Sequence, residues 1–269
     1  MLDGYGRRVR YLRISVTDRC NLRCVYCMPH EGVDWVPHDR IMTLESMAAV
    51  ARAAAQIGFD KVRVTGGEPL VRRNVLELIS MLRAIPGLEV VAMTTNGTLL
   101  APVAADLAAR GLTSVNISLD TLDPARYAAR TRGGRVEEAI AGVRAARTAG
   151  LPVKLNVVVS PDENAAEEAA DLLALRAFAA EEGCAIQTIR RYDLTAPKQD
   201  SPETMRPQPC SACDRIRLLA TGHLKPCLHS DLTVLVDSND IAGSIRACVA
   251  LKPPCGQATG THLVSAIGG

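Results

Sequence analysis

The feature that most constrains the fold is an alternation of short β-branched runs with longer alanine-rich segments. The β-branched runs occupy residues 11–16, 61–65, 89–94, 114–119, 153–159 and 185–192. Between them lie helical patterns, most of which end at glycine, at 44–58, 74–85, 101–111, 135–150 and 164–182. Strands that alternate with helices are typical of a parallel sheet, and glycine commonly ends a helix. The sequence therefore predicts an α/β fold of six β/α units, which is a partial TIM barrel.

The alternation fades after residue 193, and this change predicts the domain organisation. Residues 195–209 are rich in proline and polar side chains, as in a linker. We therefore divide the chain into a barrel at 1–194, a linker at 195–209 and a C-terminal segment at 210–269. That segment has cysteines of its own and a helical pattern near 241–251.

Composition excludes several classes of function. The formal net charge of the 269 residues is only +2, and aromatic residues make up 3%. Neither value favours binding to nucleic acid. No apolar stretch approaches the roughly 18 residues of a membrane span, and the start of the chain is polar and basic. We expect a cytoplasmic protein that has neither a membrane nor a nucleic acid as partner.

Three of the nine cysteines lie close together, directly after the first predicted strand. Cys20, Cys24 and Cys27 have the spacing C-x3-C-x2-C. Three thiolates can hold three corners of a 4Fe–4S cluster and leave the fourth iron open to a small molecule. A structural zinc site would need a fourth ligand, and only His30 lies near enough in the sequence to supply it. We therefore predict an iron–sulfur cluster here.

A second cysteine set lies in the C-terminal segment. Cys210 and Cys213 form a C-x2-C pair, and Cys227 follows thirteen residues later. Again there are three ligands. Taken alone, this set leaves a zinc site open as an alternative, with His229 or Cys255 as the fourth ligand. The contexts of the remaining cysteines, Cys184, Cys248 and Cys255, are typical of buried structural thiols.

A glycine motif follows the second predicted strand. In VTGGEP (64–69), Gly66 and Gly67 can let the backbone approach a ligand, and Glu68 can accept a hydrogen bond from an ammonium group. The sequence TTNG follows the third strand, and its Asn96 could equally be part of a simple turn. In barrels of this kind the chemistry lies at the carboxyl ends of the strands, where all of these residues are expected.

Together these motifs resemble the radical S-adenosylmethionine (SAM) superfamily, and the resemblance extends along nearly the whole chain. Tyr26 occupies the aromatic position before the third cysteine. Within the superfamily, the chain is similar to the MoaA-type GTP 3′,8-cyclases of molybdenum cofactor biosynthesis. The segments that carry this similarity are RISVTDRCNLRCVYCMP (13–29), KVRVTGGEPLVR (61–72), TTNG (94–97), NISLDTLDP (116–124), AGLPVKLNVV (149–158), the C-x2-C-x-R-x-R run at 210–217 and the terminal Gly268–Gly269.

The resemblance implies a specific reaction and a set of cofactors. The first cluster would cleave SAM to a deoxyadenosyl radical, which takes hydrogen from the ribose C3′ of GTP, and the carbon radical then attacks guanine C8. The product is (8S)-3′,8-cyclo-7,8-dihydroguanosine triphosphate. A second 4Fe–4S cluster would bind the guanine through its open iron. The implied partners are GTP and an electron donor such as flavodoxin or ferredoxin, and a homodimer is compatible with the sequence.

The resemblance also implies roles for individual residues. Six cysteines would bind the clusters: Cys20, Cys24, Cys27, Cys210, Cys213 and Cys227. SAM would be bound by Tyr26, Gly66, Gly67, Glu68, Asn96 and Ser118. The substrate would be bound by Arg13, Lys61, Arg63, Thr94, Lys154, Arg215 and Arg217. The catalytic set would be Cys20, Cys24, Cys27, Arg215, Arg217, Gly268 and Gly269.

The chain departs from the family pattern between residues 160 and 210. The family usually carries R-F-I-E-x-M on its last barrel strand, where this chain reads RRYDLT at 190–195. Some tens of residues that normally follow are reduced to the linker. Two alternatives therefore stay open: a two-cluster radical SAM enzyme that acts on a peptide or another nucleotide, and a non-catalytic zinc-binding protein.

Overall fold

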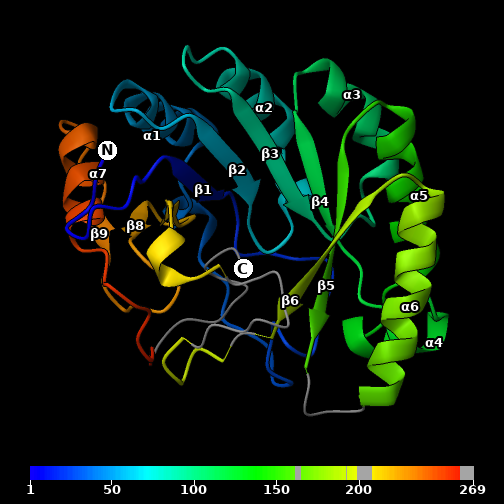
Figure 1. The fold of residues 1–269 in the computed structure, drawn as a ribbon. Helices are drawn as coiled ribbons and strands as arrows, with labels where there is room; N and C mark the ends of the chain where they lie inside the picture. The colour runs from blue at the N-terminus through cyan, green and yellow to red at the C-terminus, as the bar shows by residue number, and fades with distance from the viewer. Residues whose placement is uncertain (161–164, 192, 199–207, 261–269) are drawn as a thin grey trace.

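The fold is built on one curved sheet (Figure 1). The computed structural model describes residues 1–160, 165–191, 193–198 and 208–260. Over these residues the strand order is β6-β5-β4-β3-β2-β1-β7-β8-β9. The first six strands are β1 (Tyr11–Ser15), β2 (Lys61–Thr65), β3 (Val90–Thr95), β4 (Ser114–Ser118), β5 (Val153–Val159) and β6 (Ala185–Arg190), and all are parallel. The six predicted strands are confirmed, and the sheet stays open because β6 and β9 are its edges.

Helices connect the parallel strands, as predicted. They are α1 (Leu44–Gln56), α2 (Val75–Arg83), α3 (Ala104–Ala109), α5 (Val136–Thr148) and α6 (Ala165–Glu181). The pattern at 101–111 begins as the 3-10 helix η3 (Ala101–Val103), which contains Pro102, before α3 starts. The sequence analysis missed α4 (Pro124–Thr131), although Asp123 caps it by accepting from the Arg126 N–H at 2.8 Å and Pro124 stands at its first position.

The C-terminal segment adds three strands to the same sheet. β7 (Arg215–Leu218) pairs in parallel with β1, and β8 (His223–Lys225) and β9 (Val234–Leu235) follow in antiparallel order. The predicted helix near 241–251 is α7 (Ile241–Ala250). The sequence analysis did not identify these strands, since each has at most four residues. The division into barrel, linker and C-terminal segment remains a prediction.

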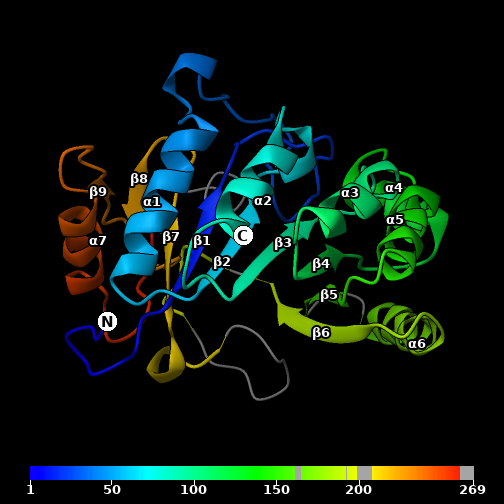
Figure 2. The same cartoon turned by 90° about the horizontal axis from the view of Figure 1, so that it is seen from above.

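The two faces of the sheet differ in chemistry because successive side chains of a strand point to opposite sides. Leu12, Val62, Val91, Val115 and Leu155 are fully buried and belong to the main hydrophobic core. Viewed from above, helices α1, α2, α3, α5 and α6 cover that outer face (Figure 2). The alternate positions of the same strands carry Arg13, Lys61, Asn116 and Lys154, so the inner face is polar.

Candidate functional site

The inner face of the sheet encloses a cavity of about 240 Å³. Side chains from β1 to β7 and from the loop after β1 line it. Of the residues predicted to function, the cavity brings together Arg13, Cys20, Cys24, Tyr26, Cys27, Lys61, Arg63, Gly66, Gly67, Thr94, Asn96, Ser118, Lys154 and Arg215. Glu68, Arg217, Cys210, Cys213 and Cys227 are not among its lining residues. Gly268 and Gly269 lie outside the described residues.

Strand register places the basic residues in two rows. Arg13 on β1 lies between Arg63 on β2 and Arg217 on β7. One step earlier on the same face, Tyr11 lies between Lys61 and Arg215. Because parallel neighbours in register point the same way, each row lies on the inner side of three adjacent strands, and all members of the two rows except Arg217 line the cavity. Arg217 is buried, with 5% of its surface exposed.

Tyr11 is a site residue that the sequence analysis missed. Its hydroxyl accepts a hydrogen bond from Arg63 Nε at 2.9 Å, and Lys61 Nζ lies 4.8 Å from the centre of its ring. Burial opposes ionisation of the phenol, but Arg13, Arg63, Arg215 and Lys61 outweigh it and lower the pKa of Tyr11 to about 8. The shift reports how strongly positive this end of the cavity is. The one signal for Tyr11 was its pairing with Lys61 in the register of β1 and β2.

The two glycines of the GGEP motif make a close contact that the sequence analysis did not predict, and their predicted contact with a ligand remains a prediction. A Cβ at Gly67 would lie 2.4 Å from the carbonyl oxygen of Arg19, and one at Gly66 would lie 2.7 Å from that of Thr17. The Gly67 N–H donates to Thr17 O at 2.8 Å. The close approach is therefore to the backbone of the cysteine loop, which no residue larger than glycine would permit. Both glycines also line the cavity.

Glu68 is not among the lining residues of the cavity, and its predicted contact with an ammonium group remains a prediction. Its carboxylate accepts from the Leu70 N–H at 3.0 Å, from Thr95 Oγ1 at 2.7 Å and from the Asn96 N–H at 2.7 Å. The residue is 1% exposed, and burial raises its pKa to about 7. Glu68 thus fixes the end of β3 against the GGEP loop.

Asn96 lies in a turn and also lines the cavity, and its predicted contact with SAM remains a prediction. The next residue, Gly97, has a φ of +82°, so the segment is a turn. Yet Asn96 lines the cavity, and its Nδ2 donates to Asn21 Oδ1 at 2.9 Å and lies 3.9 Å from Cys20 Sγ. The turn therefore joins β3 to the cysteine loop.

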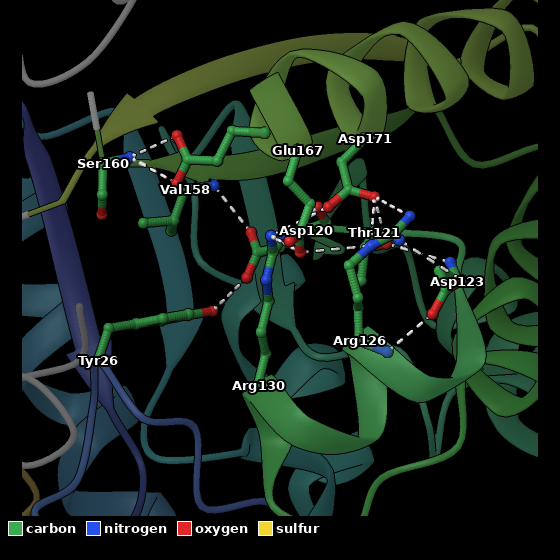
Figure 3. A network of polar contacts seen from close by, with 11 residues as sticks. Tyr26, Asp120, Thr121, Asp123, Arg126, Arg130, Val158, Ser160, Glu167 and Asp171 are labelled. Atoms are coloured by element: carbon green, nitrogen blue, oxygen red, sulfur yellow. Dashed lines mark hydrogen bonds and ion pairs between the residues drawn. The ribbon is translucent and has the colours of Figure 1, made fainter. Parts of the chain in front are cut away.

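A polar network holds the other side of the cysteine loop (Figure 3). The Tyr26 hydroxyl donates to Asp120 Oδ2 at 2.8 Å, and the Val158 N–H donates to Asp120 Oδ1 at 2.8 Å. Arg130 donates to the Asp120 carbonyl at 2.9 Å and pairs with Asp171 on α6 at 3.0 Å. Asp120 was missed, although it stands in the quoted NISLDTLDP segment two residues after Ser118. Tyr26 is therefore a support of the loop as well as a lining residue.

The three cysteines of this loop suit an iron–sulfur cluster. All three thiols line the cavity, and burial raises the pKa of Cys20 and Cys27 and raises that of Cys24 to about 12. Such thiols ionise readily only beside added positive charge, which bound iron supplies. Within the described part of the chain no three His, Cys, Asp or Glu side chains are grouped around one metal-ion position. A 4Fe–4S cluster places each thiolate on a different iron and needs no such convergence.

The second cysteine set lies between the start of β7 and the loop after α7. Buried Lys252 donates from Nζ to Cys213 Sγ at 3.4 Å, to the Arg215 carbonyl at 2.8 Å and to the Pro226 carbonyl at 3.1 Å. Burial opposes ionisation of Cys213, but Lys252 and Arg215 outweigh it and lower the pKa of the thiol. Arg215, two residues on, lines the main cavity, so the second set lies beside its edge.

The remaining cysteines divide into confirmed and corrected predictions. Cys248 is fully buried on α7, as predicted. Cys184 is partly buried. Cys255 is exposed, so its assignment as a buried thiol was wrong. Its Sγ lies 3.4 Å from Cys210 Sγ, because the loop after α7 folds back onto the second set.

Several further lining residues come from late strands. Asn116 Nδ2 and Gln187 Nε2 both donate to Asn156 Oδ1, at 3.1 and 3.3 Å. Arg190 and Arg191 add two cations at the end of β6. The sequence analysis quoted both arginines in the segment that departs from the family pattern, where Arg191 replaces the usual phenylalanine, but did not place them in a site. Their position after a strand was the available signal.

Comparisons with known proteins agree with this arrangement. The family model of the radical SAM superfamily matches residues 14–173. A protein from Peptoclostridium acidaminophilum named GTP 3′,8-cyclase is 40% identical over 91% of this chain and 87% of its own length. A relative of the same name from Moorella thermoacetica is 40% identical over 92% of this chain and 88% of its own length.

The chain belongs to the radical SAM superfamily and, within it, to the GTP 3′,8-cyclase family. It is therefore an enzyme of the radical SAM type, and its cofactors are SAM and two 4Fe–4S clusters. Among solved structures, Streptococcus suis SuiB bound to S-adenosylmethionine has a TM-score of 0.66 at 17% identity over 89% of this chain and 68% of that one. That likeness shows the fold. Among the described residues, no helix is long and apolar enough to cross a membrane.

Proposed function

We propose that this radical SAM enzyme converts GTP to (8S)-3′,8-cyclo-7,8-dihydroguanosine triphosphate in molybdenum cofactor biosynthesis. One observation supports a triphosphate as the substrate. The cavity lining includes seven basic side chains, and no Asp or Glu is among its described residues. The seven are Arg13, Lys61, Arg63, Lys154, Arg190, Arg191 and Arg215. A cavity whose charged side chains are all basic attracts a polyanion. Arginine guanidinium groups can each donate two hydrogen bonds to phosphate oxygens.

The first cysteine loop is the proposed site of radical formation. Cys20, Cys24 and Cys27 would hold the cluster there, and a bound cluster would supply the electron for reductive cleavage of SAM. The protein positions this centre through Gly67 on one side and the Tyr26–Asp120 bond on the other. SAM would lie against the ends of β3 and β4, where Asn96 and Ser118 line the cavity.

The substrate would occupy the part of the cavity nearer β1, β2 and β7. Arg13, Lys61, Arg63 and Arg215 bind its phosphates, and Thr94 adds a hydroxyl on the neighbouring strand. Arg217 supports them from the buried position next to Arg13 in the strand register. Lys154 and the Asn116–Asn156–Gln187 cluster face them from β4 to β6, where amide groups can bind sugar hydroxyls.

The second cysteine set would bind the guanine. Cys210, Cys213 and Cys227 leave one iron without a protein ligand when they hold a cluster. Arg215 links this site to the cavity because it follows Cys213 by two residues and lines the cavity itself. Gly268 and Gly269, outside the described residues, complete the proposed catalytic set. The electron donor is proposed to be a flavodoxin or ferredoxin, and the active form a homodimer.

The test uses anaerobically reconstituted full chain with SAM, dithionite and GTP. Deoxyadenosine and a cyclised triphosphate should both appear by mass spectrometry. Arg215→Met should raise the KM for GTP by about tenfold or more at an unchanged KM for SAM, because only the triphosphate needs the guanidinium. Arg144→Met is the matched control, since Arg144 pairs with Glu182 on the exposed helical side. Deoxyadenosine without change in GTP would show that the substrate is another molecule.

A further inference from the structure

Two thiols that lie far apart in the sequence meet at the second cysteine set. Cys210 Sγ and Cys255 Sγ are 3.4 Å apart, although 45 residues separate them. Cys210 belongs to the short helix η4 (Cys210–Ala212), and Cys255 lies in the loop after α7. Cys210 is partly buried and Cys255 is exposed, so a small reagent in solution can reach the pair.

One guanidinium holds the two backbones together. Arg7 Nη1 donates to the Cys210 carbonyl at 2.9 Å and to the Pro254 carbonyl at 3.2 Å, and Nη2 donates to the Pro253 carbonyl at 2.7 Å. Asp3 holds Arg7 in turn through a bond to Nε at 2.6 Å. The thiols therefore meet because the fold fixes the segments on both sides of the contact, independently of any metal.

Lys252 fastens the same loop from its other end. Its Nζ reaches Cys213 Sγ at 3.4 Å and two carbonyls, so residues 252–255 lie on the second set as one unit. A disulfide needs a sulfur–sulfur distance of about 2 Å, and rotation of two cysteine side chains can close such a gap without moving the backbone far.

We propose that Cys210 and Cys255 form a reversible disulfide in the cluster-free chain, and that this bond withdraws one ligand of the second cluster until a thiol reductant restores it. The oxidant is a low-molecular-weight disulfide. Exposed Cys255 attacks it as the thiolate, releasing one small thiol and leaving a mixed disulfide. Cys210 then attacks the sulfur of Cys255 and releases the second small thiol. Two cysteine thiols are oxidised, and their two electrons and two protons leave on the two small thiols.

The bond controls which clusters the chain can take up. With Cys210 in a disulfide, only Cys213 and Cys227 of the second set remain, which is one ligand too few for a 4Fe–4S cluster with one open iron. The first set, Cys20, Cys24 and Cys27, keeps all of its ligands. An oxidised chain therefore takes up the radical-forming cluster alone, and reduction of the disulfide admits the second.

The experiment is made on the cluster-free full chain equilibrated with oxidised and reduced glutathione. Peptide mapping without reductant should find the Cys210–Cys255 linkage at least about tenfold more abundant in the native chain than in the same chain in guanidinium, because the fold supplies the proximity. Cys255→Ser should abolish it, and Cys184→Ser is the matched control that should leave it unchanged. Equal abundance in native and denatured chain would overturn the proposal.

Iron uptake gives a second readout that does not depend on GTP. Oxidised wild-type chain, offered preformed 4Fe–4S clusters on a carrier without thiol reductant or free sulfide, should bind about four irons, and after reduction about eight. Cys255→Ser should bind about eight under both conditions. If the oxidised wild type binds eight irons, the disulfide does not gate the site. If Cys255→Ser stays at four after reduction, Cys255 is a cluster ligand and the proposal is equally wrong.

Discussion

The two cysteine sets are held in opposite ways. The first lies on one loop of eight residues, and that loop is enclosed by the ends of neighbouring strands through Gly67, Asn96 and Asp120. The second set takes Cys210 and Cys213 from η4 and its C-cap and takes Cys227 from the loop after β8. Arg7, from one end of the described chain, and Lys252, from the other, fasten it.

This difference indicates which changes in the chain would disable each cysteine set. The supports of the first loop are strand ends of the central sheet, so the loop can be lost only with the local barrel structure. The second set depends on two cations that bridge to peripheral segments. Local changes should therefore disable the second set while the barrel stays folded. The first set should be lost only when a cysteine ligand is removed or when the barrel unfolds.

The largest effect should come from removing a ligand of the first set. Cys24→Ser should lower deoxyadenosine formation at least about a thousandfold, because the cluster that reduces SAM is no longer held. The second set should still take up about four irons. The measurement is deoxyadenosine by chromatography together with iron content. Deoxyadenosine at the wild-type rate would place radical formation elsewhere.

The next effect tests the packing of the first loop. Gly67→Ala would place a methyl group 2.4 Å from the Arg19 carbonyl oxygen, so backbone must move. We expect a loss of about 3 kcal/mol or more in the free energy of unfolding. Gly4→Ala is the control, because nothing lies within 4 Å of a Cβ there. Denaturant unfolding followed by circular dichroism measures both, and similar midpoints would show that the loop is not enclosed as described.

The contrast between the sites also explains what the sequence could predict. The strands and most helices follow from local periodicity, and the first cysteine set follows from spacing within one loop. The residues that support that set were harder to predict from the sequence. Glu68 accepts a hydrogen bond from Thr95, and Asp120, which accepts one from Tyr26, was quoted only as part of a motif. The contacts of Arg7 with Cys210 and Pro254 join residues more than 200 positions apart, and nothing local encodes them. Likewise, the exposure of Cys255 depends on how the loop after α7 returns to the sheet.

A smaller effect should separate the sites directly. Arg7→Lys keeps the charge but cannot bridge three carbonyls, because an ammonium lacks the planar fork of guanidinium. We expect the second set to lose iron, so that the total falls from about eight toward four, while deoxyadenosine formation in the absence of GTP persists. The control is Arg144→Lys on the exposed pair with Glu182. A loss of iron from both sets in equal measure would contradict the separation.

The smallest effect concerns the carboxylate that holds Arg7. Burial opposes ionisation of Asp3, but hydrogen bonds from the backbone N–H groups of Arg7 and Tyr5 and from the Arg7 guanidinium outweigh it and lower its pKa. A lowered pKa in the folded chain stabilises the fold above the ordinary carboxyl value of 3.8, and this stabilisation is lost as the pH falls through the lowered value.

Asp3→Asn should therefore cost about 1–3 kcal/mol at pH 7, because the amide leaves part of this hydrogen-bonding unmet. The difference from wild type should stay constant down to about pH 5 and shrink below the ordinary carboxyl pKa, since wild-type Asp3 then becomes protonated as well. Denaturant unfolding of the cluster-free chain at a series of pH values measures it. A difference that does not change with pH would mean that the charge of Asp3 contributes nothing and that Arg7 is held by shape alone.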